Sequence, residues 1–488
     1  MLIVGGEVDG QPGVDVRVVD GRIAEVAPGL TRQPGETRLD AAGGALIPGL
    51  HDHHLHLRAL AAAPGSVLAG PPEVDDAATL MVRLRAAGGA TPPGHWIRAV
   101  GYHESVAGSL DRAWLDAAVD QRPVRVQHRS GALWILNSLG LASVRAATTD
   151  QPGIERDEHG QPTGRLWRLD RWLADALPPA SLAIAAVARQ AAGRGVTGFT
   201  DADPERTQAD VDLLRSAADH GDLLQRMVLM SSAGLDLGPH TAPDELGRPP
   251  ARFTAGPRKL LLDDATLPPL DELADRCRAA HRQGEAVAVH CVTRLQLVAT
   301  AAALAEAGPR AGDRIEHAGV VPPELRLELC RLGVTVVTQP NFVSERGDAY
   351  LREVDTDDVA LLYPCASLQA AGIAVASGTD APFGDPDPWA AMRAAVHRRT
   401  RAGAVLADDE RIDARAALDL FLGHPDRPGT GRRIAPGAPA DLCVLDRPLD
   451  AVHAALAADP DADADAPASA LNPVTVTLAA GSIIADNR

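Results

Sequence analysis

Short apolar runs, each ending in a polar or charged residue, recur through the middle of the chain with helix-like stretches between them. An early run, ALIPGLHDHHLHL, covers residues 45–57. Strands that alternate with helices are typical of a parallel sheet. Eight βα units are the number that closes a barrel, so the pattern predicts an α/β fold of the TIM-like (β/α)8 type. The other seven runs are GVTGFTDAD (195–203), LQRMVLM (224–230), PRKLLLDD (257–264), EAVAVHC (285–291), DRIEHAG (313–319), GVTVVTQP (333–340) and GIAVASGTD (372–380).

The two ends of the chain indicate a second, smaller structure. The N-terminal residues consist of short alternating strands, and Asp20-Gly21 suits the two-residue turn of a hairpin. Strand-like stretches return near the C-terminus at PADLCVLD (439–446) and VTVTLAAGSIIAD (474–486). We therefore predict one composite β-sandwich, built from residues 1–47 together with residues 436–488.

The remaining chain divides into the barrel and an insertion. We assign residues 48–63 and 191–435 to the barrel, and residues 64–190 to a subdomain inserted on its substrate side. The insertion carries five of the six tryptophans, which either fill its core or wall a pocket. These are Trp96, Trp114, Trp134, Trp167 and Trp172.

Composition excludes several classes of function. The chain has 488 residues and a formal net charge of -18, which argues against nucleic-acid binding. No apolar run reaches the roughly 18 residues of a membrane span, and the five cysteines form no CxxC pair. The acidic stretch 459–467 is expected to be a solvated loop. We therefore expect a cytoplasmic protein that acts on a small molecule, with no nucleic-acid or membrane partner; a homodimer is left open.

The densest chemical signal is His51-Asp52-His53-His54-Leu55-His56. Side chains alternate along a strand, so His54 and His56 point the same way and can share one metal ion. His51 and His53 need another explanation.

Three further candidates end later strands. His290, His317 and Asp380 each stand at the carboxyl end of a predicted strand, and in an α/β barrel those ends form the active-site face. A carboxylate there can bind a metal and accept a proton from water. Glu316 precedes His317 and is expected to point to the opposite face in a structural role.

Lys259 is the only lysine among 47 lysine and arginine residues, so 46 are arginine. A neutral lysine amine can react with carbon dioxide to give an anionic carbamate that bridges metals. Arginine cannot, because its guanidinium group stays protonated. This difference gives the fourth predicted strand a chemical reason to keep a lysine.

These residues together resemble a known family. PGLHDHHLH is similar to the PGxxDxHxH signature of the metal-dependent amidohydrolase superfamily, and WIRAVGY, QPTGRL, RIEHAG, TQPNF and SGTDAPF resemble its amidohydrolase 3 group, which includes YtcJ-like and N-substituted formamide deformylase-like enzymes. The resemblance covers nearly the whole chain. It implies one or two divalent metals, with zinc expected and N6-carboxylysine at Lys259. The implied ligands are His54, His56, Lys259, His290, His317 and Asp380.

The chain departs from that group where substrate would bind. Gly-Trp-Asp is replaced by Gly101-Tyr102-His103-Glu104, and Asp-Gly-His by Ser130-Gly131-Ala132. After the lysine the group has Asp-Gly where this chain has Asp263-Asp264, and Arg294 also breaks the pattern. The candidate substrate contacts are Tyr102, His103, Glu104, His128, Arg129, Gln339 and Asn341.

We therefore expect a metal-dependent hydrolase of a non-peptide C–N bond in a linear amide, an N-formyl amine or an N-acyl amine. Metal-activated hydroxide would attack, Asp380 would act as general base and then acid, and His317 would be the second catalytic residue. Two alternatives stay open: the same site hydrolysing a cyclic amide, lactone or ester, and a non-catalytic scaffold on the same fold.

Overall fold

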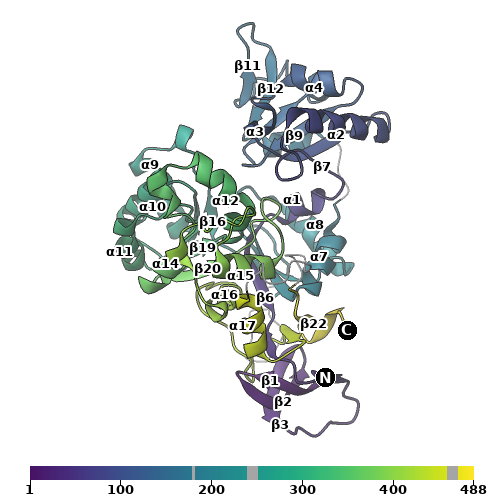
Figure 1. Cartoon of the computed structure of the whole chain (residues 1–488), viewed down its shortest axis with the longest axis vertical. Helices are drawn as coiled ribbons and strands as arrows, with labels where there is room; N and C mark the ends of the chain where they lie inside the picture. Colours follow the sequence, from purple (N-terminus) through teal and green to yellow (C-terminus); the bar gives the residue numbers. More distant parts are fainter. Residues whose placement is uncertain (178–181, 239–250, 459–470) are drawn as a thin grey trace. The chain divides into compact units, whose positions relative to one another are not determined.

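A computed structural model of the chain describes residues 1–177, 182–238, 251–458 and 471–488 (Figure 1). The predicted acidic loop 459–467 lies outside these residues. The chain divides into two compact units. The first comprises Met1–Leu57 and Ile184–Arg488, and the second comprises Arg58–Ala183.

Parallel strands form the centre of the first unit. Each of the eight apolar runs contains a strand, which confirms that part of the prediction. One sheet has the order β15-β14-β13-β6, and the other has the order β16-β17-β18-β19-β20. The first sheet consists of β6 (Leu50–Leu55), β13 (Val196–Asp201), β14 (Arg226–Leu229) and β15 (Phe253–Ala255). The second consists of β16 (Arg258–Leu260), β17 (Val287–Cys291), β18 (Arg314–His317), β19 (Thr335–Thr338) and β20 (Ala374–Ser377).

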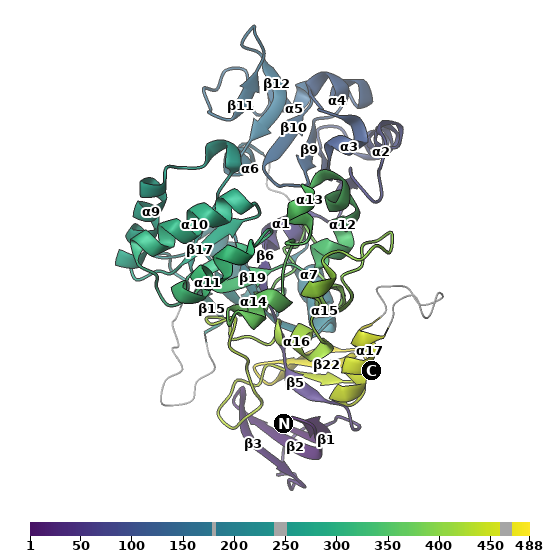
Figure 2. The ribbon, with the colours of Figure 1, turned by 60° about the vertical axis from the view of Figure 1, so that its left-hand side comes forward.

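Helices follow most of these strands and cover them. In Figure 2, α9, α10 and α11 lie on the outer side of the second sheet. Their apolar faces and the strands share one buried cluster, which includes Cys277, Leu304 and Leu329 of the helices and Val289 and Ile315 of the strands. The helices are α7 (Ile184–Gly193), α8 (Gln208–Asp219), α9 (Leu270–Arg282), α10 (Arg294–Ala307), α11 (Pro323–Leu332), α12 (Asn341–Glu353), α13 (Thr356–Val359), α14 (Ala366–Ala370), α15 (Pro388–His397) and α16 (Ala414–Asp419).

The first and last parallel strands meet outside the regular ladders. Asp380 N–H donates to His54 O at 2.7 Å, and His56 N–H donates to Ala381 O at 2.8 Å. The Asp52 carboxylate accepts from Thr379 N–H at 3.0 Å and from its hydroxyl at 2.6 Å. These bonds join the ends of β6 and β20 just where the predicted ligands begin.

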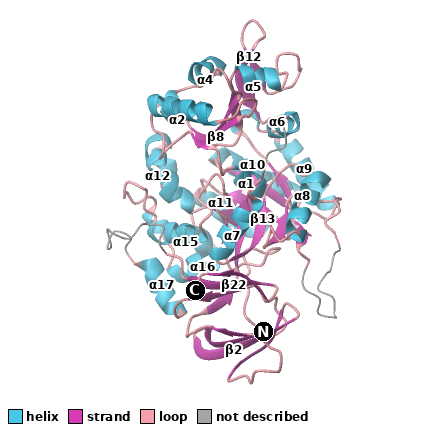
Figure 3. Ribbon diagram, turned by 90° about the vertical axis from the view of Figure 1, so that its right-hand side faces the viewer, coloured by secondary structure: helices cyan, strands magenta, loops and turns pink. Residues whose placement is uncertain are grey.

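The terminal segments form two four-stranded sheets, with orders β3-β2-β1-β4 and β23-β22-β21-β5. Asp20 and Gly21 have φ of 50° and 75°, the left-handed geometry of a hairpin turn that matches strand twist. Both sheets bury residues in one cluster, including Val16 and Val476, and Figure 3 shows β2 and β22 at the same end of the unit. The strands are β1 (Leu2–Val8), β2 (Gln11–Val19), β3 (Arg22–Pro28), β4 (Arg38–Asp40), β5 (Leu46–Pro48), β21 (Leu442–Leu445), β22 (Val474–Ala479) and β23 (Ser482–Asp486), with helix α17 (Leu449–Ala457) between β21 and β22.

The second unit has one six-stranded sheet, ordered β11-β12-β10-β9-β8-β7. Trp96, Trp134 and Trp172 pack in its core, whereas Trp167 is 41 % exposed. Its strands are β7 (Val67–Leu68), β8 (Ile97–Tyr102), β9 (Val124–His128), β10 (Leu133–Leu136), β11 (Ile154–Arg156) and β12 (Pro162–Trp167). Its helices are α2 (Ala77–Ala90), α3 (Glu104–Ala107), α4 (Arg112–Ala118), α5 (Ser138–Ser143) and α6 (Asp170–Ala176), and α1 (Leu57–Ala62) spans the boundary between the units.

Within the described parts of the chain, no helix combines the length and apolar character that a membrane crossing requires.

Gly378 occupies the closest approach between the first and last strands. A Cβ atom there would lie 2.3 Å from the backbone nitrogen of His54 and 2.6 Å from its Cβ. We expect Gly378→Ala to lower the free energy of unfolding by about 1–3 kcal/mol, because overpacking forces backbone shifts. Urea unfolding measures this. Gly431→Ala is the matched control, since its Cβ would meet nothing within 4 Å; equal effects of the two substitutions would contradict the steric account.

Candidate metal centre

Four strands deliver side chains to one place at their carboxyl ends. His54 lies on β6, Lys259 on β16, His290 on β17 and His317 on β18. The Lys259 Nζ lies 3.4 Å from His54 Nε2. The ring centres of His54 and His317 are 4.7 Å apart, and those of His290 and His317 are 4.6 Å apart.

Two further predicted ligands complete this group. His56 follows β6 and Asp380 follows β20. The Oδ1 atom of Asp380 lies 3.3 Å from His56 Nε2 and 3.6 Å from His54 Nε2. The structure thus gathers all six residues that the sequence nominated.

The donor set fits a divalent ion. Ligand atoms of His54, His56 and Asp380 all lie within 4.8 Å of one another. Two atoms that both bind a tetrahedral zinc at about 2.05 Å are about 3.3 Å apart, close to the separations at Asp380. The Asp380 Oδ1 atom is buried and has no hydrogen-bond partner among the described residues. A buried oxygen of this kind is rarely left without a partner, and a cation between these atoms would supply one.

Burial sets the charge of the group. It lowers the pKa of both His54 and His317 well below the usual histidine value. Both imidazoles are therefore neutral at neutral pH, which is the form that binds a metal. Burial also lowers the pKa of Lys259 to about 8, although Glu316 and Asp380 act in the opposite direction.

Two of these strand ends include residues with positive φ. His317 and Ala318 have φ of 70° and 49°, and Asp380 has φ of 54°. Residues with a Cβ atom rarely adopt this left-handed region. Such residues persist where the surrounding structure over-determines them, and they cluster at functional sites.

Glu316 was expected to point away from the site, and this expectation is wrong. Its carboxylate contacts His54 Nδ1, and the side chains of both residues are buried. Arg314 Nε donates to Glu316 Oε1 at 2.7 Å, and Arg314 Nη2 donates to His53 O at 2.8 Å. Glu316 therefore holds the imidazole of His54 with Nε2 turned toward the other ligands. The sequence signal for this contact is the glutamate beside the histidine in the RIEH pattern. The alternation of side chains along the strand does not hold there, because the backbone changes conformation at His317.

Gln339 orients a second imidazole. Its Oε1 lies 2.8 Å from Nδ1 of His317, which is one of the six predicted metal ligands. Asn341 Nδ2 donates to Thr379 O at 3.1 Å and to Glu345 Oε1 at 3.0 Å. A direct contact of either residue with substrate stays a prediction.

His51 and His53 lie apart from the ligand group. Their ring centres are 4.5 Å apart, and His51 Nε2 lies 2.9 Å from Thr200 Oγ1. Burial lowers the pKa of each well below the usual value. The structure thus separates the two pairs of histidines as the alternation along β6 predicts.

The remaining candidate substrate contacts belong to the second unit. The Tyr102 hydroxyl donates to Gly108 O, and the backbone N–H of Arg129 donates to Tyr102 O at 2.8 Å. His103, Glu104 and His128 form a cluster of their own. Whether any of them touches substrate stays a prediction.

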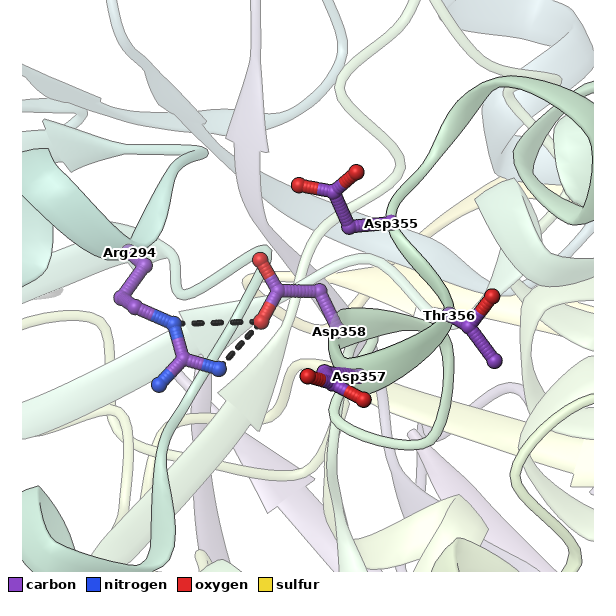
Figure 4. A pocket seen from close by; sticks show the side chains of 5 residues that line it. All are labelled: Arg294, Asp355, Thr356, Asp357 and Asp358. Atoms are coloured by element: carbon purple, nitrogen blue, oxygen red, sulfur yellow. Dashed lines mark hydrogen bonds and ion pairs between the residues drawn. The ribbon is translucent and has the colours of Figure 1, made fainter.

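Asp264 and Arg294, at which the sequence departs from the amidohydrolase 3 pattern, make contacts outside the group of six predicted ligands. Asp264 Oδ1 accepts from Thr293 Oγ1 at 2.9 Å and from Gln296 Nε2 at 2.7 Å. Arg294 Nε donates to Asp358 Oδ1 at 3.1 Å. Figure 4 shows this pair in a surface pocket whose other lining residues are Asp355, Thr356 and Asp357, with none of the six predicted ligands among them.

The contact between Glu316 and His54 generates a prediction about metal affinity. We expect Glu316→Ala to weaken metal binding by about 10–100-fold, because His54 loses the acceptor that orients it. Glu316→Gln keeps an acceptor oxygen and should lose less. Competition with a chromogenic chelator measures the affinity. The control is Glu306→Gln on the surface of α10, and unchanged affinity in Glu316→Ala would show that this contact does not orient a ligand.

Comparison with known proteins matches this sequence to one family. The model of the amidohydrolase family matches residues 38–485. The chain is 27 % identical over 473 residues to N-substituted formamide deformylase of Arthrobacter pascens, covering 86 % of each chain. It is 24 % identical over 457 residues to the amidohydrolase YtcJ of Bacillus subtilis (strain 168), covering 84 % of this chain and 86 % of that one.

Solved structures share the fold. A metal-dependent hydrolase of Pyrococcus horikoshii OT3 superposes with a TM-score of 0.68 at 20 % identity, over 91 % of this chain and 97 % of that one. N-isopropylammelide isopropylaminohydrolase of Burkholderia multivorans superposes with a TM-score of 0.53 at 19 % identity, over 100 % and 98 %. With the family match over most of its length, the chain belongs to the amidohydrolase family and is a metal-dependent hydrolase of C–N bonds other than peptide bonds.

Proposed function

We propose that this enzyme hydrolyses the C–N bond of a linear N-formyl or N-acyl amine at the centre formed by His54, His56, Lys259, His290, His317 and Asp380. The observation that carries the proposal is the buried Oδ1 of Asp380, which faces His54 and His56 with no hydrogen-bond partner among the described residues. The similarity to N-substituted formamide deformylase supports the choice of substrate class.

Different residues of the chain have different roles in the proposed reaction. A divalent ion, with zinc proposed, would supply Lewis-acid activation of water and of the amide carbonyl. Asp380 accepts the proton from the attacking water and then passes it to the leaving nitrogen, so that the amine departs neutral. His317 Nδ1 lies 2.8 Å from Gln339 Oε1 and 3.9 Å from Asp380 Oδ2, so His317 would bind the ion through Nε2 and contribute to polarising the carbonyl through that ion.

Lys259 is proposed to act as a carbamate. Its Nζ attacks the carbon of carbon dioxide, an N–C bond forms, one C=O bond becomes an anionic oxygen, and the nitrogen gives up a proton to water. Two observations support this step: Nζ lies 3.4 Å from His54 Nε2, and the side chain is buried among ligands that a permanent ammonium charge would oppose. The carbamate would let this position hold a second ion.

The finer architecture is part of the same proposal. We read the two parallel sheets as one (β/α)8 barrel, because β15 and β16 are two residues apart and backbone bonds join the ends of β6 and β20. The two terminal sheets would then form the sandwich, with residues 64–190 inserted. The homodimer stays a prediction.

A substrate panel tests the reaction. We expect N-formyl and N-acyl amines to be turned over faster than lactones, esters and cyclic amides, with release of the free amine as the readout. Asp380→Asn should reduce kcat by about 10²–10⁴-fold, since it loses proton transfer but keeps its shape. Asp385→Asn, an exposed neighbour, is the control. A cyclic amide or lactone as best substrate would favour the alternative reaction, and near-normal kcat in Asp380→Asn would refute the assigned role.

Substitution of Lys259 tests the carbamate. Lys259→Arg keeps the charge but cannot form the anion, so we expect loss of one metal equivalent and of most activity. Carbon-13 NMR of protein equilibrated with labelled bicarbonate should show a carbamate resonance that Lys259→Arg abolishes. The α-amino group of Met1 serves as internal control, because any signal from it survives the substitution. Short carboxylates should partly restore Lys259→Ala; identical spectra and activity in wild type and Lys259→Arg would rule the carbamate out.

A further inference from the structure

The second unit contains a cluster of potential metal ligands that has no step in the proposed mechanism. His103 follows β8, His128 ends β9, and Glu104 begins α3. The strands β8 and β9 are parallel and pair Tyr102 with His128, so both histidines stand at neighbouring carboxyl ends. Ligand atoms of His103, Glu104 and His128 all lie within 4.8 Å of one another.

A serine two positions later orients each of the two histidines in the same way. Each is followed two positions later by a serine, in His103-Glu104-Ser105 and His128-Arg129-Ser130. The Nδ1 atoms lie 2.9 Å from Ser105 Oγ and 2.7 Å from Ser130 Oγ. The backbone N–H groups of the same serines donate to these Nδ1 atoms at 3.3 and 3.1 Å, so each Nδ1 accepts a bond and the proton of a neutral ring lies on Nε2.

These contacts with serine turn both Nε2 atoms toward one carboxylate. Glu104 Oε2 lies 2.9 Å from His128 Nε2 and 4.0 Å from His103 Nε2. These separations lie on either side of the distance of about 3.3 Å between two ligands of a tetrahedral zinc. The ring centres of the two histidines are 5.9 Å apart.

From this arrangement we infer a second metal site, in which His103, Glu104 and His128 bind a zinc-class divalent ion. On metal binding each neutral imidazole moves its proton from Nε2 to Nδ1, so no proton is gained or lost. Nδ1 then donates to the serine hydroxyl and gives up the bond that it accepted from the serine N–H. Three protein ligands leave one position for water, as in zinc sites that stay open.

Charge and access agree with this assignment. The two histidine side chains are each 15 % exposed and Glu104 is 46 % exposed, which leaves an entry path for an ion. Arg129 and Arg165 oppose a cation nearby, and Glu104 supplies the compensating charge.

The inference does not depend on the proposed reaction, because the two metal centres lie in different units of the chain. Zinc is added to the full-length protein, and bound zinc per chain is counted after removal of loosely bound ion. We expect the wild-type chain to hold one equivalent more than His128→Ala or Glu104→Gln. Ser130→Ala should keep the site with about 10–100-fold weaker affinity, because the imidazole loses its orienting partner.

The matched control is His159→Ala in the same unit. His159 Nε2 lies 3.6 Å from Glu158 Oε1, but both side chains are highly exposed, and the cluster found around His103 contains neither residue. This variant should bind as much zinc as the wild type. Equal zinc in the wild type, His128→Ala and Glu104→Gln would overturn the second site and leave a hydrogen-bonded cluster only. Zinc lost equally in His159→Ala would also overturn it, since the loss would then not be specific to the cluster.

Discussion

The structure depends on how the first and last parallel strands meet. One backbone bond, from Asp380 N–H to His54 O, places the Asp380 carboxylate beside two imidazoles that come from the other end of the unit's chain. Asp52 secures the same junction through Thr379, and Gly378 allows the backbones to approach. A residue with a Cβ atom at Gly378 would separate the strands. The candidate metal centre is therefore formed by the junction and not by either strand alone.

Buried charge is arranged around this junction in a chain of contacts. Arg314 binds Glu316, Glu316 binds His54, and His54 faces Lys259 and Asp380. Arg314, Glu316 and His54 would each be costly to bury alone, but each has a partner in this chain of contacts. The same contacts decide which nitrogen of His54 faces inward. The same network therefore pairs the buried charges and orients His54. Gln339 orients His317 in the same way through its neutral side-chain amide.

The sequence predicted the strands and the family, and it nominated the six residues that meet at the candidate metal centre, because each rests on a local pattern. Apolar alternation located β6 and β17, and the side-chain period of two separated His54 and His56 from His51 and His53. Glu316 was misread because the period fails where the backbone turns to positive φ at His317. Gln339 was placed at the site, but its partner was not predictable, since it lies on a neighbouring strand. The grouping of His103 with His128 depends on the pairing of β8 with β9, which no local pattern reveals.

Crystallographic anomalous scattering at the zinc edge tests the central claim most directly. The account predicts a peak between His54 Nε2, His56 Nε2 and Asp380 Oδ1, with added density on Lys259 Nζ. A crystal grown with zinc that shows no peak there, and Lys259 as an ammonium group paired with Asp380, would contradict it.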